Sequence, residues 1–444
     1  MQARKILALT VGKLIFKITT ILKIGGGSAA PGLYALKIYP DLVSDLASQI
    51  PQTIVITGTN GKTTTARMLA HFATSSGLKV IRNSTGSNLE RGIASALISC
   101  SHLPTGGLKN FDLAIWELDE AAFNQIVPKL KPQIIICLNI FRDQLDRYGE
   151  VDSIVKKWCQ TLKNMPPNTT LFLNGDDHKL LSLKKCFKGP VFTFGVENYK
   201  IRGEEHFKKV GQEKLDLEAL NVTLLGLDGV KFELKESDGL WDFLLPLPGI
   251  YHIYDFLAAY VAASKLGIEK KVIIQALKSF SPAFGRVEKF TLPPPGWRHK
   301  NEGGYILLIK NPTGATQVFE TLKGELKPED RLLIALNDNL ADGTDVSWIW
   351  DADFELLQNS PRAGSRDFLI FASGTRASDL ALRLKYAGFK PEAILVENNL
   401  KKALQQATEG LKGRLFILPT YTAMLGIQKI LVQQGLKKHY WKED

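Results

Sequence analysis

Short apolar runs alternate with segments of helical periodicity over most of the chain after residue 50. The apolar runs predict strands at 53–57, 113–118, 133–139 and 170–174. Strands that alternate with helices in this way are typical of α/β proteins with parallel sheets. The first part of the pattern therefore predicts a parallel sheet with helices packed against it.

The second half of the chain repeats this pattern after an interruption. Residues 221–235 predict a hairpin with an Asp228-Gly229 turn, and a helix follows from about residue 254 to 265. Residues 293–304 are rich in proline and glycine, so they mark the best domain boundary. Beyond this boundary the alternation restarts and predicts a second, smaller α/β domain, with strands near 305–310, 331–336, 368–372, 393–397 and 414–418.

The N-terminal segment does not follow the same pattern. Residues 6–24 are strongly apolar, yet residues 1–40 carry six basic residues and no acid. Charges interrupt the run too often for a transmembrane helix, and no signal-peptide cleavage site is evident. On a helix the four lysines between residues 5 and 23 share about a third of the circumference, with Leu9 and Phe16 intruding. Two interpretations stay open: a helix at the surface of an anionic membrane, or a helix packed on its own domain with solvated lysines.

Composition and charge narrow the class of protein. At 444 residues the chain is too long for one typical core, and an apolar fraction of 45% with 23% charged residues is ordinary for a globular protein. The net charge is +11, but no basic stripe interleaved with aromatic residues is present, so nucleic acid is not an expected partner.

The four cysteines are far apart and form no C-x-x-C pair. We expect them to be reduced structural thiols of a cytosolic protein, with neither a disulfide framework nor a zinc site, and this applies to Cys100, Cys137, Cys159 and Cys186. None of them lies in a nucleophile elbow or beside a histidine. The chain alone therefore has no apparatus for releasing ammonia from glutamine.

The most specific motif is the loop Thr-Gly-Thr-Asn-Gly-Lys-Thr-Thr-Thr at 57–65. It follows an apolar run and leads into a helical segment from about residue 66 to 76. In such a loop the backbone N–H groups and the helix N-terminus face the phosphates of a nucleotide. Lys62 can reach the terminal phosphates, and the Thr63 hydroxyl can ligate Mg²⁺. The predicted nucleotide-binding residues here are Gly58, Thr59, Asn60, Gly61, Lys62, Thr63 and Thr64.

Polar residues follow three of the predicted strands. Glu117 ends the strand at 113–118, where ligands of α/β sheets gather, and its carboxylate suits Mg²⁺. A charged segment that includes Arg142 and Asp143 follows the next strand. Asn174 ends the fourth strand, and its amide could contact an adenine edge.

The loop resembles one family more than the general phosphate-binding pattern. That pattern has a glycine at position 56, where this chain has Ile56, and the short form G-T-N-G-K-T-T is characteristic of Mur ligases and folylpolyglutamate synthetases. Over nearly all of its length the chain resembles the Mur ligase family, and within it the MurT branch, which also has Gln144 where other Mur ligases have histidine. Further matching segments are 25–27, 31–33, 83–89, 143–146, 285–286, 310–314, 337–338, 345–355 and 419–423.

The resemblance implies the domain organisation. It divides the chain into a basic, apolar helical segment at 1–50, a Mur ligase central ATP-binding domain at 51–297 and a C-terminal, Rossmann-like MurT-type domain at 298–444. It implies no N-terminal nucleotide-sugar domain, which suits a lipid-linked substrate.

The resemblance also implies a reaction. ATP would phosphorylate the α-carboxylate of D-glutamate in the lipid II stem peptide, and ammonia would convert the acyl phosphate to D-isoglutamine. A GatD-type glutamine amidotransferase partner would supply the ammonia with a Cys-His pair, and an aspartate of this chain would orient its histidine. Asp351 is the first choice for this aspartate, followed by Asp345 and Asp353. Trp348 and Trp350 lie between these acids and fit a partner-facing surface.

Further site residues come from the same resemblance. Nucleotide contacts are expected from His252, Arg286, Lys310 and Asn311, with Lys62 and Arg286 neutralising developing charge. Substrate contacts are expected from Asn83, Ser84, Thr85, Ser87, Asn88, Arg142 and Asp143.

The chain departs from the family pattern in two places. Residues 197–220 contain no cysteine where relatives commonly carry a four-cysteine zinc ribbon, so we expect no zinc and a short linker or hairpin instead. His252 and Asp255 replace two asparagines of the family, and His252 is either a nucleotide contact or a surface residue at a helix start. The sequence does not place the carbamylated lysine of most Mur ligases, and Lys200 is only a guess.

Two other functions remain as alternatives. A stand-alone Mur-type or folylpolyglutamate-type ligase would share the loop, but segments 143–146 and 347–351 do not fit a folate enzyme. A non-catalytic ATP-binding scaffold is disfavoured because Lys62, Thr63 and Glu117 are all intact. The expected location is the cytoplasm, with peripheral contact to the inner face of the cell membrane left open.

Overall fold

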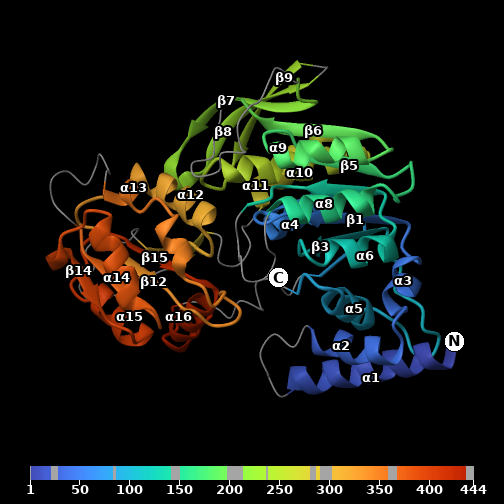
Figure 1. Cartoon of the computed structure of the whole chain (residues 1–444), viewed down its shortest axis with the longest axis horizontal. Coiled ribbons are helices and arrows are strands. Elements are labelled where there is room, and N and C mark those ends of the chain that lie inside the picture. Colours follow the sequence, from blue (N-terminus) through green and yellow to red (C-terminus); the bar gives the residue numbers. More distant parts are fainter. Residues whose placement is uncertain are drawn as a thin grey trace.

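The protein is built around two β-sheets, each with its own helices (Figure 1). The computed structural model describes residues 2–21, 29–83, 87–141, 151–197, 214–236, 239–280, 287–290, 303–358 and 368–436. Within these ranges the first sheet has nine strands in the order β2-β3-β1-β4-β5-β6-β7-β8-β9, and the second has six in the order β10-β11-β15-β12-β13-β14. The predicted α/β class is confirmed.

The strands of the first sheet run parallel from β2 to β7, while β8 and β9 extend it as antiparallel strands. Their bounds are β1 (Gln52–Thr57), β2 (Val80–Arg82), β3 (Leu113–Leu118), β4 (Ile134–Cys137), β5 (Thr170–Asn174), β6 (Val191–Val196), β7 (Leu217–Leu224), β8 (Val230–Glu236) and β9 (Gly239–Leu245).

The helices of the first unit cover both faces of this sheet. They are α1 (Gln2–Ile21), α2 (Ala30–Ile38), α3 (Leu42–Ala47), α4 (Lys62–Ser75), α5 (Glu90–Ser99), α6 (Phe123–Leu130), α8 (Val151–Leu162), α9 (His178–Leu181), α10 (Tyr251–Lys265) and α11 (Lys270–Ser279), with the short helices η1 (Ser182–Cys186) and η2 (Gly226–Asp228).

In the second unit β11, β15, β12, β13 and β14 are parallel, and β10 is antiparallel to β11. The strands are β10 (Glu288–Phe290), β11 (Gly304–Ile306), β12 (Arg331–Ala335), β13 (Ile370–Ser373), β14 (Ile394–Val396) and β15 (Leu415–Pro419). The helices are α12 (Pro312–Lys323), η3 (Ser347–Trp350), α13 (Glu355–Gln358), α14 (Ala377–Tyr386), η4 (Pro391–Ala393), α15 (Leu400–Thr408) and α16 (Tyr421–Gln433).

Strand β1 explains why the central runs are continuously apolar. Ile54 and Ile56 face the hydrophobic cluster under α4 and α10, whereas Val55 faces the cluster under α5 and α6. Alternate residues of a strand point to opposite faces, so a strand covered on both sides has no polar face. This double burial fixes β1 in the centre of the sheet, with the loop at 57–65 at its carboxyl end.

The structure confirms most predicted strands and adds four. The predicted hairpin is present as β7 and β8, and its turn contains η2 and Gly229 at a φ of +131°. The short strands β2 and β10, together with β6 and β9, were not predicted. Strand β10 pairs with β11 and so belongs to the second sheet. It precedes residue 298, the first residue that the sequence assigns to the C-terminal domain.

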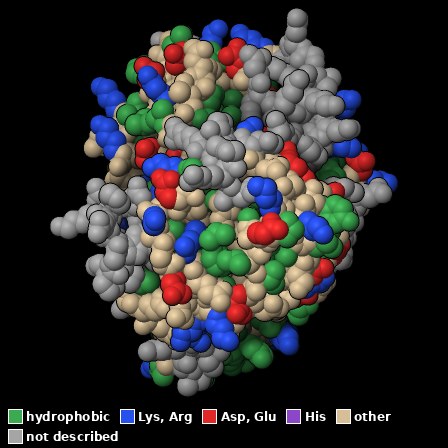
Figure 2. Space-filling model, turned by 90° about the vertical axis from the view of Figure 1, so that its left-hand side faces the viewer, with side chains coloured by type: hydrophobic (Ala, Val, Ile, Leu, Met, Phe, Trp, Pro, Cys, Tyr) green, Lys and Arg blue, Asp and Glu red, His purple; other side chains and the backbone are tan. Residues whose placement is uncertain are grey.

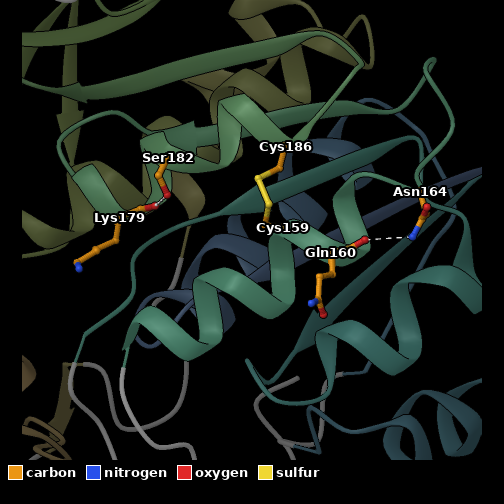
Figure 3. Close-up of a disulfide and its surroundings, with 6 residues drawn as sticks. All are labelled: Cys159, Gln160, Asn164, Lys179, Ser182 and Cys186. Atoms are coloured by element: carbon orange, nitrogen blue, oxygen red, sulfur yellow. Dashed lines mark hydrogen bonds between the residues drawn. A yellow bond between two sulfur atoms is a disulfide. The ribbon is translucent and has the colours of Figure 1, made fainter.

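One pair of cysteines corrects the sequence analysis. Cys159 in α8 and Cys186 at the end of η1 form a disulfide, with a Cα–Cα distance of 5.3 Å (Figure 3). The expectation of four reduced thiols is wrong for this pair. The two residues are 27 positions apart, and they meet only because α8 and η1 pack together after the chain has passed through β5. Cys100 and Cys137 are free thiols.

Alkylation of the unfolded chain should therefore modify two cysteines without reductant and four after reduction. The measurement is intact mass after iodoacetamide treatment in denaturant, with and without prior reduction. The Cys159→Ser variant is the matched control, because it should expose Cys186 and give three modified thiols without reductant. Four modifications of the unreduced parent chain would contradict the pairing.

Helix α1 packs on its own unit. Ala8, Leu9 and Gly12 are buried, and the helix contacts α2 and α5. A β-carbon at Gly12 would lie 2.9 Å from the Ile98 side chain, so glycine permits this close approach. Among the described residues, no helix is long and apolar enough to cross a membrane.

Candidate active site

The loop after β1 is shaped by two glycines with positive φ. Gly58 has a φ of +137° and Gly61 a φ of +89°. A β-carbon at Gly58 would lie 2.9 Å from the Asn139 carbonyl oxygen, and one at Gly61 would lie 2.1 Å from Asp255 Oδ1. Side chains at either position would force the loop away from its neighbours. The loop therefore lies tightly between the ends of β1 and β4 and the start of α10.

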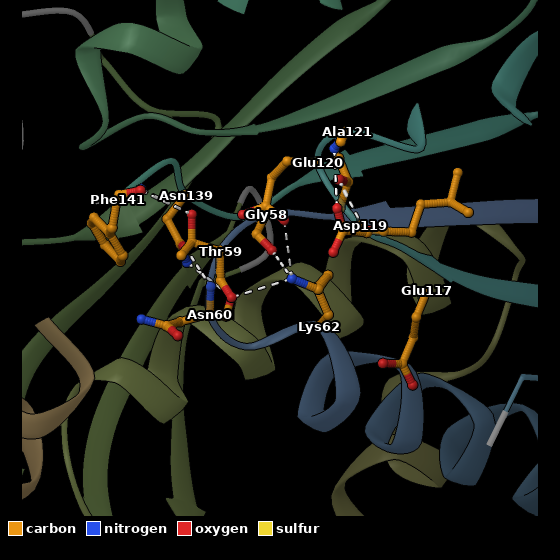
Figure 4. A network of polar contacts seen from close by, with 12 residues as sticks. Gly58, Thr59, Asn60, Lys62, Glu117, Asp119, Glu120, Ala121, Asn139 and Phe141 are labelled. Atoms are coloured by element: carbon orange, nitrogen blue, oxygen red, sulfur yellow. Dashed lines mark hydrogen bonds and ion pairs between the residues drawn. The ribbon is translucent and has the colours of Figure 1, made fainter. Parts of the chain in front are cut away.

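Lys62 is buried at the start of α4. Its ammonium group donates hydrogen bonds to the carbonyls of Gly58 and Thr59, and it lies 3.5 Å from Glu120 Oε2 (Figure 4). Glu120 is also buried, so this ion pair is shielded from water. The loop thus holds a positive charge at the point where the terminal phosphates of a nucleotide would bind. Glu120 lies in the acidic segment after β3, and nothing in the local sequence distinguishes it from its acidic neighbours.

Thr63 and Glu117 form the second element of the site. Thr63 Oγ1 donates to Glu117 Oε2 at 2.7 Å. Asn83 fixes the backbone of Glu117, because its Oδ1 accepts from Glu117 N and its Nδ2 donates to Glu117 O, both at 2.9 Å. A hydroxyl beside a carboxylate is a donor set that Mg²⁺ accepts. Among the described residues no group of three His, Cys, Asp or Glu could hold a metal alone, so Mg²⁺ would take its other ligands from phosphate and water.

The second unit closes over the loop. Asn60 and Asn311 exchange side-chain hydrogen bonds of 3.3 and 3.1 Å, and Lys310 Nζ donates to Thr59 O at 3.3 Å. Asn311 is also the N-cap of α12, since its Oδ1 accepts from Gly314 N at 2.8 Å. On the other side Asn139 binds both the N–H and the carbonyl of Asn60. The loop is therefore held both by the segment that follows β4 and by the second unit.

A cavity lies between the loop, α10 and α12. The predicted residue Asn174 lines it, and its amide donates to Leu138 O at 2.9 Å and accepts from Asp176 N at 3.0 Å. Several lining residues carry polar groups that could contact a nucleotide. The lining comprises Asn60, Gly61, Asn139, Phe141, Asn174, Tyr251, Tyr254, Asp255, Leu308, Lys310, Gly314, Gln317 and Val318.

His252 is buried at the start of α10, so the interpretation of it as a surface residue is wrong. A nucleotide contact by His252 stays a prediction. Its Nδ1 lies 3.0 Å from Asp255 Oδ2, and Asp255 itself reaches the cavity and the loop. Asp255 therefore places a carboxylate beside the loop, and the His252 imidazole contacts this carboxylate. The sequence marked Asp255 as a departure from the family without a role, because its approach to Gly61 depends on how α10 packs.

Several predicted residues lie outside the described part of the chain. These are Ser84, Thr85, Arg142, Asp143, Lys200 and Arg286, and residues 198–213 of the expected linker are also outside it. Of the remaining predicted substrate residues, Ser87 O accepts from Asn83 Nδ2 at 3.1 Å and Asn88 O accepts from Asp119 N at 2.9 Å. The backbone at 87–88 is thereby fixed beside the end of β3.

The three candidate aspartates lie around η3 in the second unit. Asp345 Oδ1 accepts from Ser347 N at 2.8 Å, and this hydrogen bond holds the pKa of Asp345 below its ordinary value. The backbone N–H of Asp353 donates to Thr316 Oγ1 of α12 at 3.1 Å. Asp351 is exposed and follows Trp350, whose side chain is 48% exposed. Asp345 is exposed as well, whereas Asp353 is half-buried, so the choice among the three aspartates stays a prediction.

Arg383 holds the backbone around Asp351 in place through hydrogen bonds. Its buried guanidinium donates to the carbonyls of Ile349 and Ala352 at 3.0 and 2.8 Å. It also donates two bonds of 2.9 Å to the Glu355 carboxylate, and this pairing lowers the pKa of Glu355. Trp350 packs edge-on against Tyr386, which is 71% exposed. Figure 2 shows the face of the second unit, where hydrophobic side chains lie among charges of both signs.

Replacing Arg383 with methionine should lower the free energy of unfolding by about 3 kcal/mol. The change removes four hydrogen bonds and leaves two carbonyls and a carboxylate without this donor. Urea unfolding followed by circular dichroism gives the value. Arg376→Met is the matched control, because Arg376 is partly exposed and its ion pairs with Asp338 and Asp379 should contribute at most about 1 kcal/mol. Equal destabilisation by both changes would refute the anchoring role of Arg383.

The fold and the loop define an ATP-dependent ligase of the Mur type. The Mur ligase middle domain family matches residues 56–263, and the MurT ligase C-terminal family matches residues 308–424. The chain is 31% identical to the "Lipid II isoglutaminyl synthase (glutamine-hydrolyzing) subunit MurT" of Streptococcus pneumoniae, over 93% of this chain and 94% of that protein. It is 29% identical to the subunit of the same name from Staphylococcus aureus, over 90% and 91% of the two chains. The chain belongs to the MurT family.

Solved structures support the fold independently. MurF from Acinetobacter baumannii aligns with a TM-score of 0.67 at 20% identity, covering 89% of this chain and 80% of that one. Folylpolyglutamate synthase from Mycobacterium tuberculosis, complexed with ADP, aligns with a TM-score of 0.62 at 17% identity, covering 90% and 94%. At these identities the likeness concerns the fold alone.

Proposed function

We propose that this chain is the ligase subunit of a lipid II isoglutaminyl synthase. The observation that carries the proposal is the phosphate loop, with Lys62 and the Thr63–Glu117 pair, held under a second unit of the MurT type. The sequence similarity to MurT subunits over nearly the whole chain supports the same substrate class.

The first half-reaction makes an acyl phosphate. An oxygen of the D-glutamate α-carboxylate attacks the γ-phosphorus of ATP, the bond to the β-phosphate oxygen breaks, and ADP leaves. Lys62 and the loop N–H groups stabilise the charge that develops on the phosphate oxygens. Thr63 and Glu117 would hold Mg²⁺, which neutralises charge on the phosphates. Residues 87–88, which are fixed beside the end of β3, would flank the acceptor peptide.

The second half-reaction replaces phosphate with nitrogen. Ammonia attacks the carbonyl carbon, inorganic phosphate leaves, and the product is the D-isoglutamine amide. A GatD-type glutamine amidotransferase would supply the ammonia. Within this chain Cys159 and Cys186 are paired and Cys137 is fully buried, so none of these three thiols is available as a nucleophile. Burial raises the pKa of the Cys137 thiol well above its ordinary range, which suppresses the thiolate. Asp351 would orient the histidine of that partner.

The test is ATP-dependent amidation of lipid II, measured by mass spectrometry. The purified chain is supplied with ammonium, and separately with glutamine and a co-expressed amidotransferase. We expect a loss of about one mass unit, from carboxylate to amide, in both arms and only with ATP and Mg²⁺. No mass change with either nitrogen source, despite measurable ATP binding, would favour another acceptor, such as a folate, or a scaffold. The proposed location is the cytoplasm at the inner face of the membrane, because the acceptor is lipid-linked.

A further inference from the structure

Helix α1 has two apolar faces, and only one of them is used by the fold. The buried face contains Ala8, Leu9 and Gly12, which pack against α2 and α5. In Figure 1 α1 lies at the edge of the molecule, on the far side of α2 from the nine-stranded sheet. The remainder of its surface therefore faces outward.

The outward face is an apolar stripe. Leu7, Val11, Leu14, Ile18 and Ile21 follow one another at spacings of four, three, four and three residues, which places them on one side of a helix. Leu7 is 54%, Leu14 57%, Ile18 45% and Ile21 68% exposed. A contiguous apolar stripe on a surface is typical of an interaction site rather than of a solvated helix.

The charged residues of α1 itself are all basic. Residues 1–40 contain Arg4, Lys5, Lys13, Lys17, Lys23 and Lys37, and the first acidic residue is Asp41. Lys5 lies 3.9 Å from Asp45, so this lysine is already near a carboxylate of the fold. Lys17 is exposed and Lys13 is half-buried, and at helical spacing both lie on the same side of the stripe. The nearby helix α2 adds exposed Tyr34, with Lys37 Nζ 5.5 Å above its ring.

This charge pattern selects the occupant. A second copy packed on the stripe would bring lysines against lysines, since α1 has no carboxylate to pair with them. A membrane with anionic headgroups supplies both missing complements: acyl chains for the leucines and isoleucines, and negative charge for the lysines. Tyrosine and lysine side chains are also favoured at the level of the headgroups.

We propose that the outward face of α1 docks on the surface of an anionic lipid bilayer. The helix lies in the interface with Leu7, Leu14, Ile18 and Ile21 toward the acyl chains, and Lys13 and Lys17 contact the headgroups. The proposal stands on the helix itself and does not depend on the proposed reaction. If both hold, docking places the unit next to its acceptor, because α1 packs on α5 and α5 begins directly after residues 87–89.

The experiment uses the full chain and sedimented vesicles of phosphatidylcholine, either alone or with a third of phosphatidylglycerol. We expect binding to the anionic vesicles that weakens at high salt. The double variant Leu14→Gln/Ile21→Gln should lower the partition coefficient about tenfold or more. Lys13→Gln/Lys17→Gln should lower it about tenfold on anionic vesicles and remove the preference over neutral ones.

Matched controls separate docking from general effects. Leu244→Gln changes a leucine of the β9 edge that is 59% exposed, and Lys412→Gln changes an exposed lysine of the second unit, so both should bind vesicles like the parent chain. Thermal unfolding and ATP binding of every variant should be unchanged, because the altered side chains are outside the cores. Amidation of detergent-dispersed lipid II is measured in parallel, so loss of docking and loss of the reaction are distinguished.

Three results would overturn the proposal. The parent chain could fail to bind anionic vesicles, or the Leu14→Gln/Ile21→Gln variant could bind them as well as the parent. Alternatively, analytical ultracentrifugation without lipid could show a dimer that this variant abolishes, which would assign the stripe to a second copy.

Discussion

Replacing Lys62 with methionine should reduce ATP-dependent amidation by about 10²–10³-fold. The ammonium group of Lys62 is buried where the loop turns into α4, and its bonds to Gly58 and Thr59 hold it against the loop. Methionine has a similar length and no charge, so it keeps the packing and removes the interaction with the phosphates. The readout is kcat with saturating ammonium, which excludes any effect of the partner.

A second substitution at Glu120, the ion-pair partner of Lys62, separates loss of catalysis from loss of stability. In Lys62→Met the buried Glu120 carboxylate loses the cation 3.5 Å away, and this could destabilise the fold independently of catalysis. The double variant Lys62→Met/Glu120→Gln removes the unpaired charge and should restore the unfolding temperature while leaving the activity lost. Lys79→Met, at an exposed lysine before β2, should retain activity within about twofold. Recovery of activity in the double variant would show that Lys62 acts only through stability.

The Asp351→Asn variant should lose glutamine-dependent amidation by about 10³–10⁴-fold and keep ammonium-dependent amidation. Asparagine preserves the shape of the side chain but cannot stabilise the histidine of a partner as an imidazolium. Asp351 is exposed beside Trp350 in the second unit, whereas the phosphate loop of this chain lies in the first unit. The ligase half-reaction should therefore not change. The two nitrogen sources are compared with the same lipid II preparation and a fixed excess of amidotransferase.

Neighbouring acids provide the controls for Asp351. Asp345→Asn removes a carboxylate that caps Ser347 N, and Asp353→Asn changes a residue whose backbone is tied to Thr316. Either variant should lower the glutamine-dependent rate by less than about tenfold. Trp350→Ala should weaken assembly with the amidotransferase, which a titration reveals as a raised concentration for half-maximal rate. Equal loss of both activities in Asp351→Asn would exclude its role toward the partner.

Local sequence patterns predicted the features that depend on consecutive residues. β1 and β3 are continuous apolar runs, and the loop at 57–65 follows the first of them, so strand, turn and helix could all be read in order. The position of Glu117 near the end of an apolar strand also followed from consecutive residues. These features require no knowledge of which elements become neighbours.

The features that the sequence did not predict depend on tertiary contacts. Glu120 faces Lys62 only because β3 lies beside β1, and Asp255 reaches Gly61 only because α10 packs over α4. The Cys159–Cys186 bond likewise depends on the packing of α8 against η1. β2 is only three residues long, too short for a periodic signal. β9 is largely exposed at the sheet edge, so its apolar residues do not show which face is inward.

Helix α12 contacts both the phosphate loop and the segment that contains the candidate aspartates. At its first turn Asn311 binds Asn60 of the phosphate loop, and one turn later Thr316 binds the backbone of Asp353, beside the proposed partner surface. Because the phosphate loop and the aspartate segment both bind α12, a displacement of the loop would be transmitted to the aspartate segment through this helix. A substitution that displaces α12 is therefore expected to disturb the phosphate loop and the aspartate segment together.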